Sequence, residues 1–239
     1  MADPRLVGLI FVVSNIICKD KGYILSLLIY FLGCIWFSVV LKMLYGDPRP
    51  FWTSSVVKTL SDNCHFDYGN PFGATLTPIL LFESIIIYAT GVGKGRILLL
   101  IPILLSALIP IAGIYLGIAS SNQVLLGLII HLSLLILFKL YFARILTELL
   151  HEINHYTEKG KGMMIWMFFI HLITILTPLA IFLYRPKPPL ERTVLINIGN
   201  SCEVIPSSLQ DINFQMLLLS AIVNVCFGYC YGYYIDGKT

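Results

Sequence analysis

Several apolar stretches, each about as long as a lipid bilayer is thick, constrain this chain more than any other feature. Of its 239 residues, 57% are hydrophobic and only 12% are charged, a balance that is too apolar for a soluble globular domain. We therefore expect an all-α fold, a polytopic membrane helical bundle with six or seven transmembrane helices in a single membrane domain over residues 1–239. The formal net charge of +3 is spread along the chain, so no nucleic-acid partner is expected.

The order of apolar and polar segments predicts the spans and the side of the membrane on which each loop lies. The loops 46–73, 119–122 and 185–212 fall on one face. Lysine and arginine are slightly more frequent on the opposite face, which favours placing these three loops away from the cytosol. The predicted spans are 23–44, 74–88, 97–118 (kinked by Pro102 and Pro110), 123–150, 163–184 and 214–234, with a short additional apolar stretch at 6–18.

The polar segment after the span 23–44 carries a candidate anion site. Lys42 and Arg49 stand at its start, and residues 70–74 (Asn-Pro-Phe-Gly-Ala) turn into the next apolar helix. A helix start presents backbone N–H groups without intrahelical partners and carries a partial positive charge. Two basic side chains on the same membrane face would add countercharge for a phosphate. The sequence therefore predicts a phosphate cradle formed by Lys42, Arg49 and Gly73.

This spacing resembles the signatures of the type 2 phosphatidic acid phosphatase (PAP2) superfamily. Lys42, six intervening residues and then Arg49-Pro50 are similar to its first signature. Residues 71–74 (Pro-Phe-Gly-Ala) are similar to its second signature, whose usual form is Pro-Ser-Gly-His. The run Arg49-Pro50-Phe51-Trp52 and the later Cys64 resemble the branch that contains glucose-6-phosphatase.

The third signature of the family is similar to this chain only in its flanks. The matching stretch is 112–119, with Gln123 and Gly127 following, and each chemically active position in it is changed. The resemblance covers about residues 22–130. It implies a PAP2-like core there, with two additional C-terminal transmembrane helices at 163–184 and 214–234.

The resemblance implies catalytic roles that this chain does not fill. In the family, histidines of the second and third signatures act as general acid and nucleophile, an aspartate orients the nucleophile, and a serine and a second arginine bind phosphate. The corresponding positions here are Ala74, Ala119, Gln123, Phe72 and Gly113. Alanine offers neither a proton nor a lone pair, so the family's chemistry lacks its donors. No catalytic residue is expected.

The resulting hypothesis is a catalytically inactive, PAP2-like integral membrane protein. It is either a structural subunit of a membrane complex or a lipid- or phosphate-binding protein that uses the remnant Lys42, Arg49 and Gly73. The expected partners are membrane lipids and other membrane protein subunits, and neither a cofactor nor a metal is expected. The compartment stays open between the endoplasmic reticulum and the mitochondrial inner membrane.

Two enzymatic alternatives also stay open. The first is a divergent lipid-phosphate phosphatase with relocated catalytic groups, such as His65 acting from the loop. The second is a membrane-embedded zinc metalloprotease, because His151-Glu152-Ile153-Asn154-His155 matches the pattern His-Glu-x-x-His. On a helix this spacing puts both histidines on one face and the glutamate where it could activate water. The sequence that follows shows no clear third ligand.

Ionisable residues inside the predicted spans and two loop cysteines are candidate structural pairs. Glu83, His131 and His171 lie within spans, where such side chains are costly. We call the membrane side of the loops 46–73, 119–122 and 185–212 the cradle face. Glu83 and His131 lie at matching depth from the cradle face, so we expect them to pair. Cys64 and Cys202 lie in loops on that same face, and they could form a disulfide if the compartment is oxidising.

Overall fold

The computed structural model describes residues 21–57, 67–75, 100–142, 144–146, 148, 158–184, 192–202 and 209–236. These parts of the chain are helical and contain no β-strand. By length and composition, three of the described helical stretches could cross a membrane: Ile29–Thr53, Ser121–Phe142 and Ile165–Tyr184. The structure thus agrees with the predicted all-α class and with an integral membrane protein.

The long helices lie where the apolar stretches predicted spans. Helices α2 (Lys21–Tyr45), α8 (Glu158–Tyr184) and α10 (Leu209–Asp236) each contain one predicted span and extend beyond it. The predicted spans 6–18 and 74–88 lie outside the described residues, except for the first two residues of the latter.

The connection between α5 (Leu100–Tyr115) and α6 (Ser121–Leu137) differs in its boundaries from the prediction. Gly117 adopts a φ of 70°, a left-handed conformation that glycine tolerates, so α5 ends before the predicted residue 118. The side chain of Ser120 accepts from the backbone of Gln123, while the side chain of Gln123 accepts from the backbone of Ser120. This capping box starts α6 at Ser121, earlier than the predicted 123. The helix continues into a π-helical turn, Phe138–Phe142.

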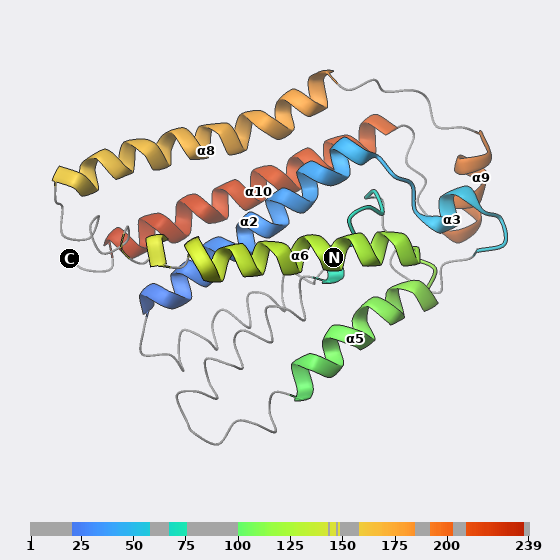
Figure 1. Ribbon diagram of the computed structural model, residues 1–239. Coiled ribbons are helices and arrows are strands. Elements are labelled where there is room, and N and C mark those ends of the chain that lie inside the picture. The colour runs from blue at the N-terminus through green and yellow to red at the C-terminus, as the bar shows by residue number, and fades with distance from the viewer. Residues whose placement is uncertain are drawn as a thin grey trace.

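Two segments that were predicted as polar loops contain short helices, which corrects the sequence analysis. Helix α3 (Pro50–Thr53) begins with a proline, whose fixed φ suits the first helical position. Helix α9 (Arg192–Ser201) packs against α3. Asn197 Nδ2 donates to the carbonyl oxygen of Trp52 at 3.1 Å and joins the two helices. Figure 1 shows α3 and α9 together, beyond the end of α2.

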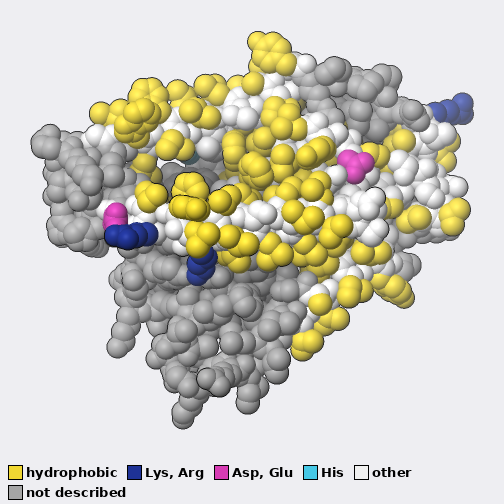
Figure 2. Space-filling view, in the orientation of Figure 1, with side chains coloured by type: hydrophobic (Ala, Val, Ile, Leu, Met, Phe, Trp, Pro, Cys, Tyr) yellow, Lys and Arg dark blue, Asp and Glu magenta, His cyan; other side chains and the backbone are white. Residues whose placement is uncertain are grey.

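The long helices form a bundle around α2. Helix α10 lies along α2, and α8 packs on both of them, while α6 runs along the other side of α2 with α5 beside it (Figure 1). Hydrophobic side chains cover most of the described surface in Figure 2, and only a few charged ones interrupt them. This surface is what a helical bundle surrounded by lipid requires.

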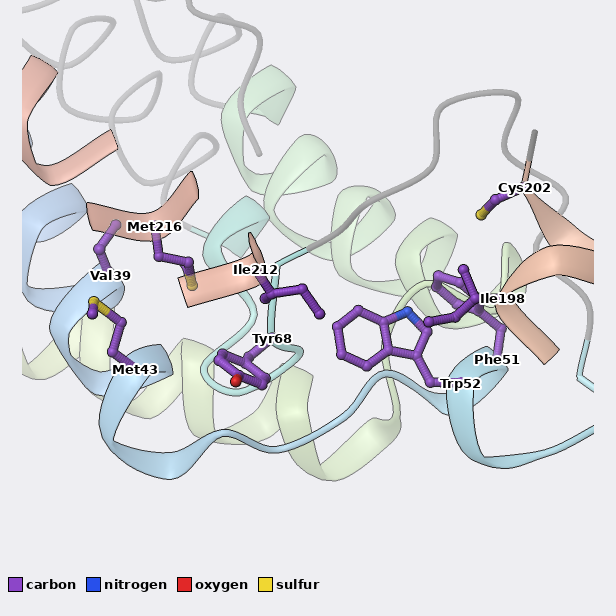
Figure 3. Close-up of a cluster of buried hydrophobic side chains, with 9 residues drawn as sticks. All are labelled: Val39, Met43, Phe51, Trp52, Tyr68, Ile198, Cys202, Ile212 and Met216. Carbon is purple, nitrogen blue, oxygen red and sulfur yellow. The ribbon is translucent and has the colours of Figure 1, made fainter. Parts of the chain in front are cut away.

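A buried hydrophobic cluster fixes the end of the bundle at which α2 stops. Side chains from α2 and α10 meet those of α3 and α9 there, so the two short helices are held against the ends of the long ones (Figure 3). Because Arg49 directly precedes α3, this packing also positions Arg49. The cluster consists of Val39, Met43, Phe51, Trp52, Tyr68, Ile198, Cys202, Ile212 and Met216.

Candidate functional site

Lys42 and Arg49, the two basic residues of the predicted cradle, lie on either side of one carboxylate, that of Asp67. Lys42 Nζ donates to Asp67 Oδ2, and Arg49 Nη2 donates to Asp67 Oδ1 at 2.5 Å. Both basic residues are almost fully buried, with 3% of Lys42 and 1% of Arg49 exposed. We call Lys42, Arg49 and Asp67 the ion cluster.

Arg49 also joins segments that are distant in the sequence. Its Nε donates to the backbone oxygen of Asp67, and its Nη1 donates to the backbone oxygen of Ile118, both at 2.8 Å. The planar guanidinium group therefore binds three acceptors, with a different nitrogen facing each of them. One side chain ties the start of α3 to the 67–75 segment and to the turn between α5 and α6.

The charges of the ion cluster fix the protonation state of Asp67. Burial by itself would raise the pKa of this carboxyl group, but the charges of Arg49 and Lys42, with the hydrogen bond from Lys42, outweigh burial and hold the pKa well below its usual range. Asp67 is therefore ionised at neutral pH. It supplies, from within the chain, one negative charge between two buried cations.

Gly73, the third predicted cradle residue, lies beside the ion cluster. A β-carbon built on Gly73 would lie 3.8 Å from Lys42 Nζ. Gly73 starts a single 3₁₀ turn, Gly73–Thr75, labelled η1. The structure thus brings Lys42, Arg49 and Gly73 together, and places the carboxylate of Asp67 between the two basic side chains.

Gln123, at the start of α6, holds the same region together through hydrogen bonds of its side chain and its backbone. Its Nε2 donates to Asp47 Oδ2 and to the carbonyl oxygen of Pro48, both at 2.9 Å. Its own carbonyl oxygen accepts from the backbone N–H of Phe72 at 3.2 Å. A β-carbon on Gly69 would lie 2.4 Å from Gln123 Nε2, so only glycine leaves room for this side chain.

Phe72 packs into space that two glycines leave open. A β-carbon on Gly113 of α5 would lie 2.6 Å from Phe72 Cζ, and one on Gly127 of α6 would lie 2.7 Å from the Phe72 carbonyl oxygen. The aromatic ring therefore occupies the position at which a larger residue 113 would project. The two helices approach the 72–75 turn this closely only because both contact positions are glycine.

Ala74 and Ala119 belong to the same apolar packing. Ala119 is 2% exposed and lies in a buried cluster with Phe72, Ile118 and Val124, and Ala74 packs against this cluster. No nucleophilic or acid–base side chain belongs to this cluster in the described part of the chain. The arrangement at these positions is that of a hydrophobic core.

His131 lies fully buried on α6 and links three elements. Its Nε2 lies 2.9 Å from Ser38 Oγ of α2, and its Nδ1 lies 2.6 Å from Thr75 Oγ1. Thr75 donates its single hydroxyl proton to the Phe72 carbonyl oxygen at 2.8 Å, so it can only accept from His131. Nδ1 of the neutral ring therefore carries the proton, and Nε2 accepts from Ser38.

Several predicted site residues lie outside the described residues: Glu83, Cys64, His65 and the stretch 151–155. The expected pair of Glu83 with His131 therefore stays a prediction. Cys202 is disulfide-bonded, and its expected pairing with Cys64 stays a prediction as well. Among the described residues, no three His, Cys, Asp or Glu side chains lie close enough together to hold a metal ion.

Asp67 is the residue of this site that the sequence analysis missed. The signal was its position: a carboxylate a few residues before the Asn70-Pro71 turn, in the same loop as Arg49. Once Arg49 and Gly73 are expected to meet, that carboxylate must come close to both basic residues. From the sequence alone, we expected an external anion to supply the countercharge.

Comparisons of the chain with protein-family models, with curated proteins and with solved structures find no match.

Proposed function

We propose that this chain is a catalytically inactive membrane protein of PAP2-like fold with six or seven spans, in which the former phosphate site has become a structural ion cluster. Its role is then non-catalytic, as a structural subunit of a membrane complex. The proposal takes the fold from the resemblance of Lys42, Arg49-Pro50 and residues 71–74 to the family signatures.

The observation that carries the proposal is the position of Asp67. An external phosphate at Lys42 and Arg49 would have to displace a carboxylate that both cations already bind. Displacement would leave the buried, ionised Asp67 without its partners, which typically costs about 3–5 kcal/mol. The carboxylate of Asp67 therefore already occupies the position beside Lys42 and Arg49 that an external phosphate would need.

The packing around Ala74 and Ala119 supports the same conclusion. A phosphotransfer mechanism of the family type needs a nucleophile and an acid on opposite sides of the phosphorus atom. The two alanines instead contribute to an apolar cluster with Phe72. Loss of a nucleophile alone costs on the order of a millionfold in turnover.

A phosphatase assay tests the absence of catalysis. Purified full-length protein is expected to release no phosphate above background from phosphatidate, sphingoid phosphate or glucose 6-phosphate. The control is the same preparation with Lys42→Met, confirmed as folded by its melting curve, because background hydrolysis by a contaminant is unaffected by this change. Turnover that Lys42→Met abolishes in a folded protein would contradict the proposal.

Purification from native membranes tests the structural role. We expect the tagged protein to migrate with a defined high-molecular-weight assembly after mild solubilisation, at a fixed ratio to the other subunits. A protein that has only lipids as partners would instead migrate as a monomer in a detergent micelle. A monomer under conditions that preserve known complexes of the same membrane would overturn the subunit role and leave the inactive fold untouched.

A further inference from the structure

The geometry points to a binding site for one chloride ion beside Lys42, on the side of its ammonium group that faces Gly73. The ion balances the charge of the ion cluster without displacing Asp67, so its place differs from the position between Lys42 and Arg49 that the carboxylate fills. The inference rests on the contacts of the ion cluster alone and does not depend on the proposed function. It is carried by the charge of the cluster, the unpaired donors of Lys42 and the space beside Gly73.

The ion cluster has two positive charges and one negative charge. Lys42 and Arg49 both bind Asp67, and the three residues form no other ion pair in the described part of the chain. Asp47, the other acidic residue of this loop in the described ranges, accepts from Gln123 Nε2 at 2.9 Å instead. Because Lys42 and Arg49 are buried, water screens the excess positive charge poorly. A further anion beside the cluster is therefore stabilised.

The ammonium group of Lys42 has hydrogen-bond donors without a partner. It carries three N–H donors, and among the described residues Nζ donates to Asp67 Oδ2 alone. Arg49, by contrast, directs a different nitrogen at each of three acceptors. An unpaired donor on a buried charged group is costly, so a further acceptor is expected beside it. That acceptor is expected at Lys42 rather than at Arg49.

Gly73 leaves room for this acceptor. Apart from its chain neighbours, the only described atom within 4 Å of a β-carbon built at residue 73 is Lys42 Nζ, at 3.8 Å, which is an ordinary van der Waals contact. The space that a side chain at 73 would enter therefore borders the ammonium group. Gly73 is half-buried, whereas Lys42 and Asp67 are buried. An ion from the aqueous phase thus reaches the cluster from the Gly73 side.

An anion of single charge and single-atom size fits this place best. Phosphate has four oxygen atoms around its phosphorus and needs the position that the carboxylate of Asp67 fills. A carboxylate ligand brings two oxygens and a carbon chain, whereas the contact at Gly73 shows room for a group of methyl size. A chloride ion is about as large as a methyl group, and its one negative charge equals the excess positive charge of the cluster.

Chloride-dependent stability tests the site in the purified full-length protein. Melting is followed in mild detergent at neutral pH while sodium chloride is replaced stepwise by sodium gluconate at constant ionic strength, so that screening stays the same. We expect the melting temperature to rise with chloride and to level off, as binding to the folded state alone requires. Radiolabelled chloride should bind saturably, with one ion per chain. Excess bromide should displace it, and phosphate at the same concentration should not.

Lys42→Met and a matched pair of glycine variants locate the ion. Lys42→Met keeps the ion pair of Arg49 with Asp67 but removes the excess charge and the unpaired donors. In protein shown to be folded by its melting curve, it should weaken chloride binding about tenfold or more. Gly73→Ala places a methyl group beside Nζ and should weaken binding too. Gly33→Ala adds the same group inside α2, with nothing within 4 Å of it, and should leave binding unchanged.

Two results would overturn the inference and leave the exclusion of phosphate by Asp67 untouched. The first is a wild-type melting temperature that is equal in chloride and in gluconate. The second is saturable chloride binding that neither Lys42→Met nor Gly73→Ala weakens, because the ion would then lie elsewhere. Displacement of chloride by phosphate as readily as by bromide would overturn the inference as well, since a site open to phosphate does not hold Asp67 in place.

Discussion

The carboxylate of Asp67 binds two cations that reach it from different parts of the chain. Lys42 comes from the last turn of α2, and Arg49 comes from the residue before α3. Each binds a different oxygen of the carboxylate. Removing Asp67 leaves two buried positive charges without a counterion, whereas removing Lys42 or Arg49 leaves one ion pair.

Replacement of Asp67 by asparagine should therefore destabilise the protein strongly. The change keeps the shape of the side chain but leaves Lys42 and Arg49 without a counterion, so we expect a loss of about 3–5 kcal/mol in the free energy of unfolding. Melting of the purified protein in mild detergent measures this. The control is Glu148→Gln, which removes an ion pair with Arg144 that is largely exposed and should not change the melting temperature measurably.

The pH dependence of the stability difference between wild type and Asp67→Asn follows from the lowered pKa of Asp67. In the unfolded chain this carboxyl group has a pKa of about 3.9. Because its pKa in the folded protein is lower, the stabilisation is fully present above the unfolded value and is lost as the pH falls below it toward the folded value. The stability difference between wild type and Asp67→Asn should be constant from about pH 8 to pH 5 and shrink below about pH 4. A difference that instead grows as the pH falls from 7 to 5 would show a carboxyl group with a raised pKa.

The sequence was informative about which residues meet at this site and less so about how their charges are satisfied. The spacing of Lys42, Arg49 and Gly73 was enough to expect them together, and the structure places them around one carboxylate. Asp67 was missed because nothing in its local sequence distinguishes a buried carboxylate from an exposed loop residue. Its role depends on contacts with residues that lie 18 and 25 positions away along the chain.

At the scale of elements, glycine contacts determine how α6 meets the 72–75 turn. The helix passes so close to this turn that a β-carbon on Gly127 would lie 2.7 Å from the Phe72 carbonyl oxygen and 3.1 Å from its backbone nitrogen. Backbone atoms cannot move aside as a flexible side chain can. The contact therefore fixes the distance between α6 and the turn, and with it the hydrogen bonds of His131.

Gly127→Ala should push α6 away from the 72–75 turn. The overlap with backbone should cost about 1–3 kcal/mol, more than the gain in helix propensity. Gly33→Ala is the control, because Gly33 lies inside α2 with nothing within 4 Å of a β-carbon, and it should stabilise the protein by about 0.5–1 kcal/mol. Thermal melting of the two variants should show stability changes of opposite sign. A stabilising Gly127→Ala would mean that α6 does not contact the turn as described.

The elements that the sequence predicted and those that it missed differ in what stabilises them. Helices such as α2, α8 and α10 are long and apolar, so hydropathy alone located them. Helices α3 and α9 are short and form where Trp52 and Ile198 pack together, so their stability comes from tertiary contacts that no local pattern shows. The predicted start of α6, residue 123, was too late, because the prediction did not consider the capping box of Ser120 and Gln123, which starts the helix at Ser121.

At the scale of the molecule, the disulfide of Cys202 indicates which compartment the cradle face meets. Cys202 follows α9, which packs on α3 beside the ion cluster. Disulfides persist in oxidising compartments and are rare in the cytosol. The cradle face should therefore lie on the non-cytosolic side, as the distribution of lysine and arginine also favours.

Alkylation of the denatured protein without reductant checks this disulfide. We expect the thiols of Cys34 and Cys226 to be modified, because both are free cysteines, and Cys202 to be modified only after reduction. Mass spectrometry of unreduced peptides should then find Cys202 linked to Cys64. Modification of Cys202 before reduction would contradict both the bond and the orientation.

Binding of radiolabelled inorganic phosphate to the purified full-length protein tests the central claim most directly, because that claim is that Asp67 already occupies the cation pair. Wild type is expected to show no saturable binding at millimolar phosphate. Asp67→Ala, in protein shown to be folded by its melting curve, should create a saturable site, and adding Arg49→Met should remove that site again. Saturable phosphate binding by wild type that Arg49→Met alone abolishes would contradict the account, because Lys42 and Arg49 would then be serving an external anion.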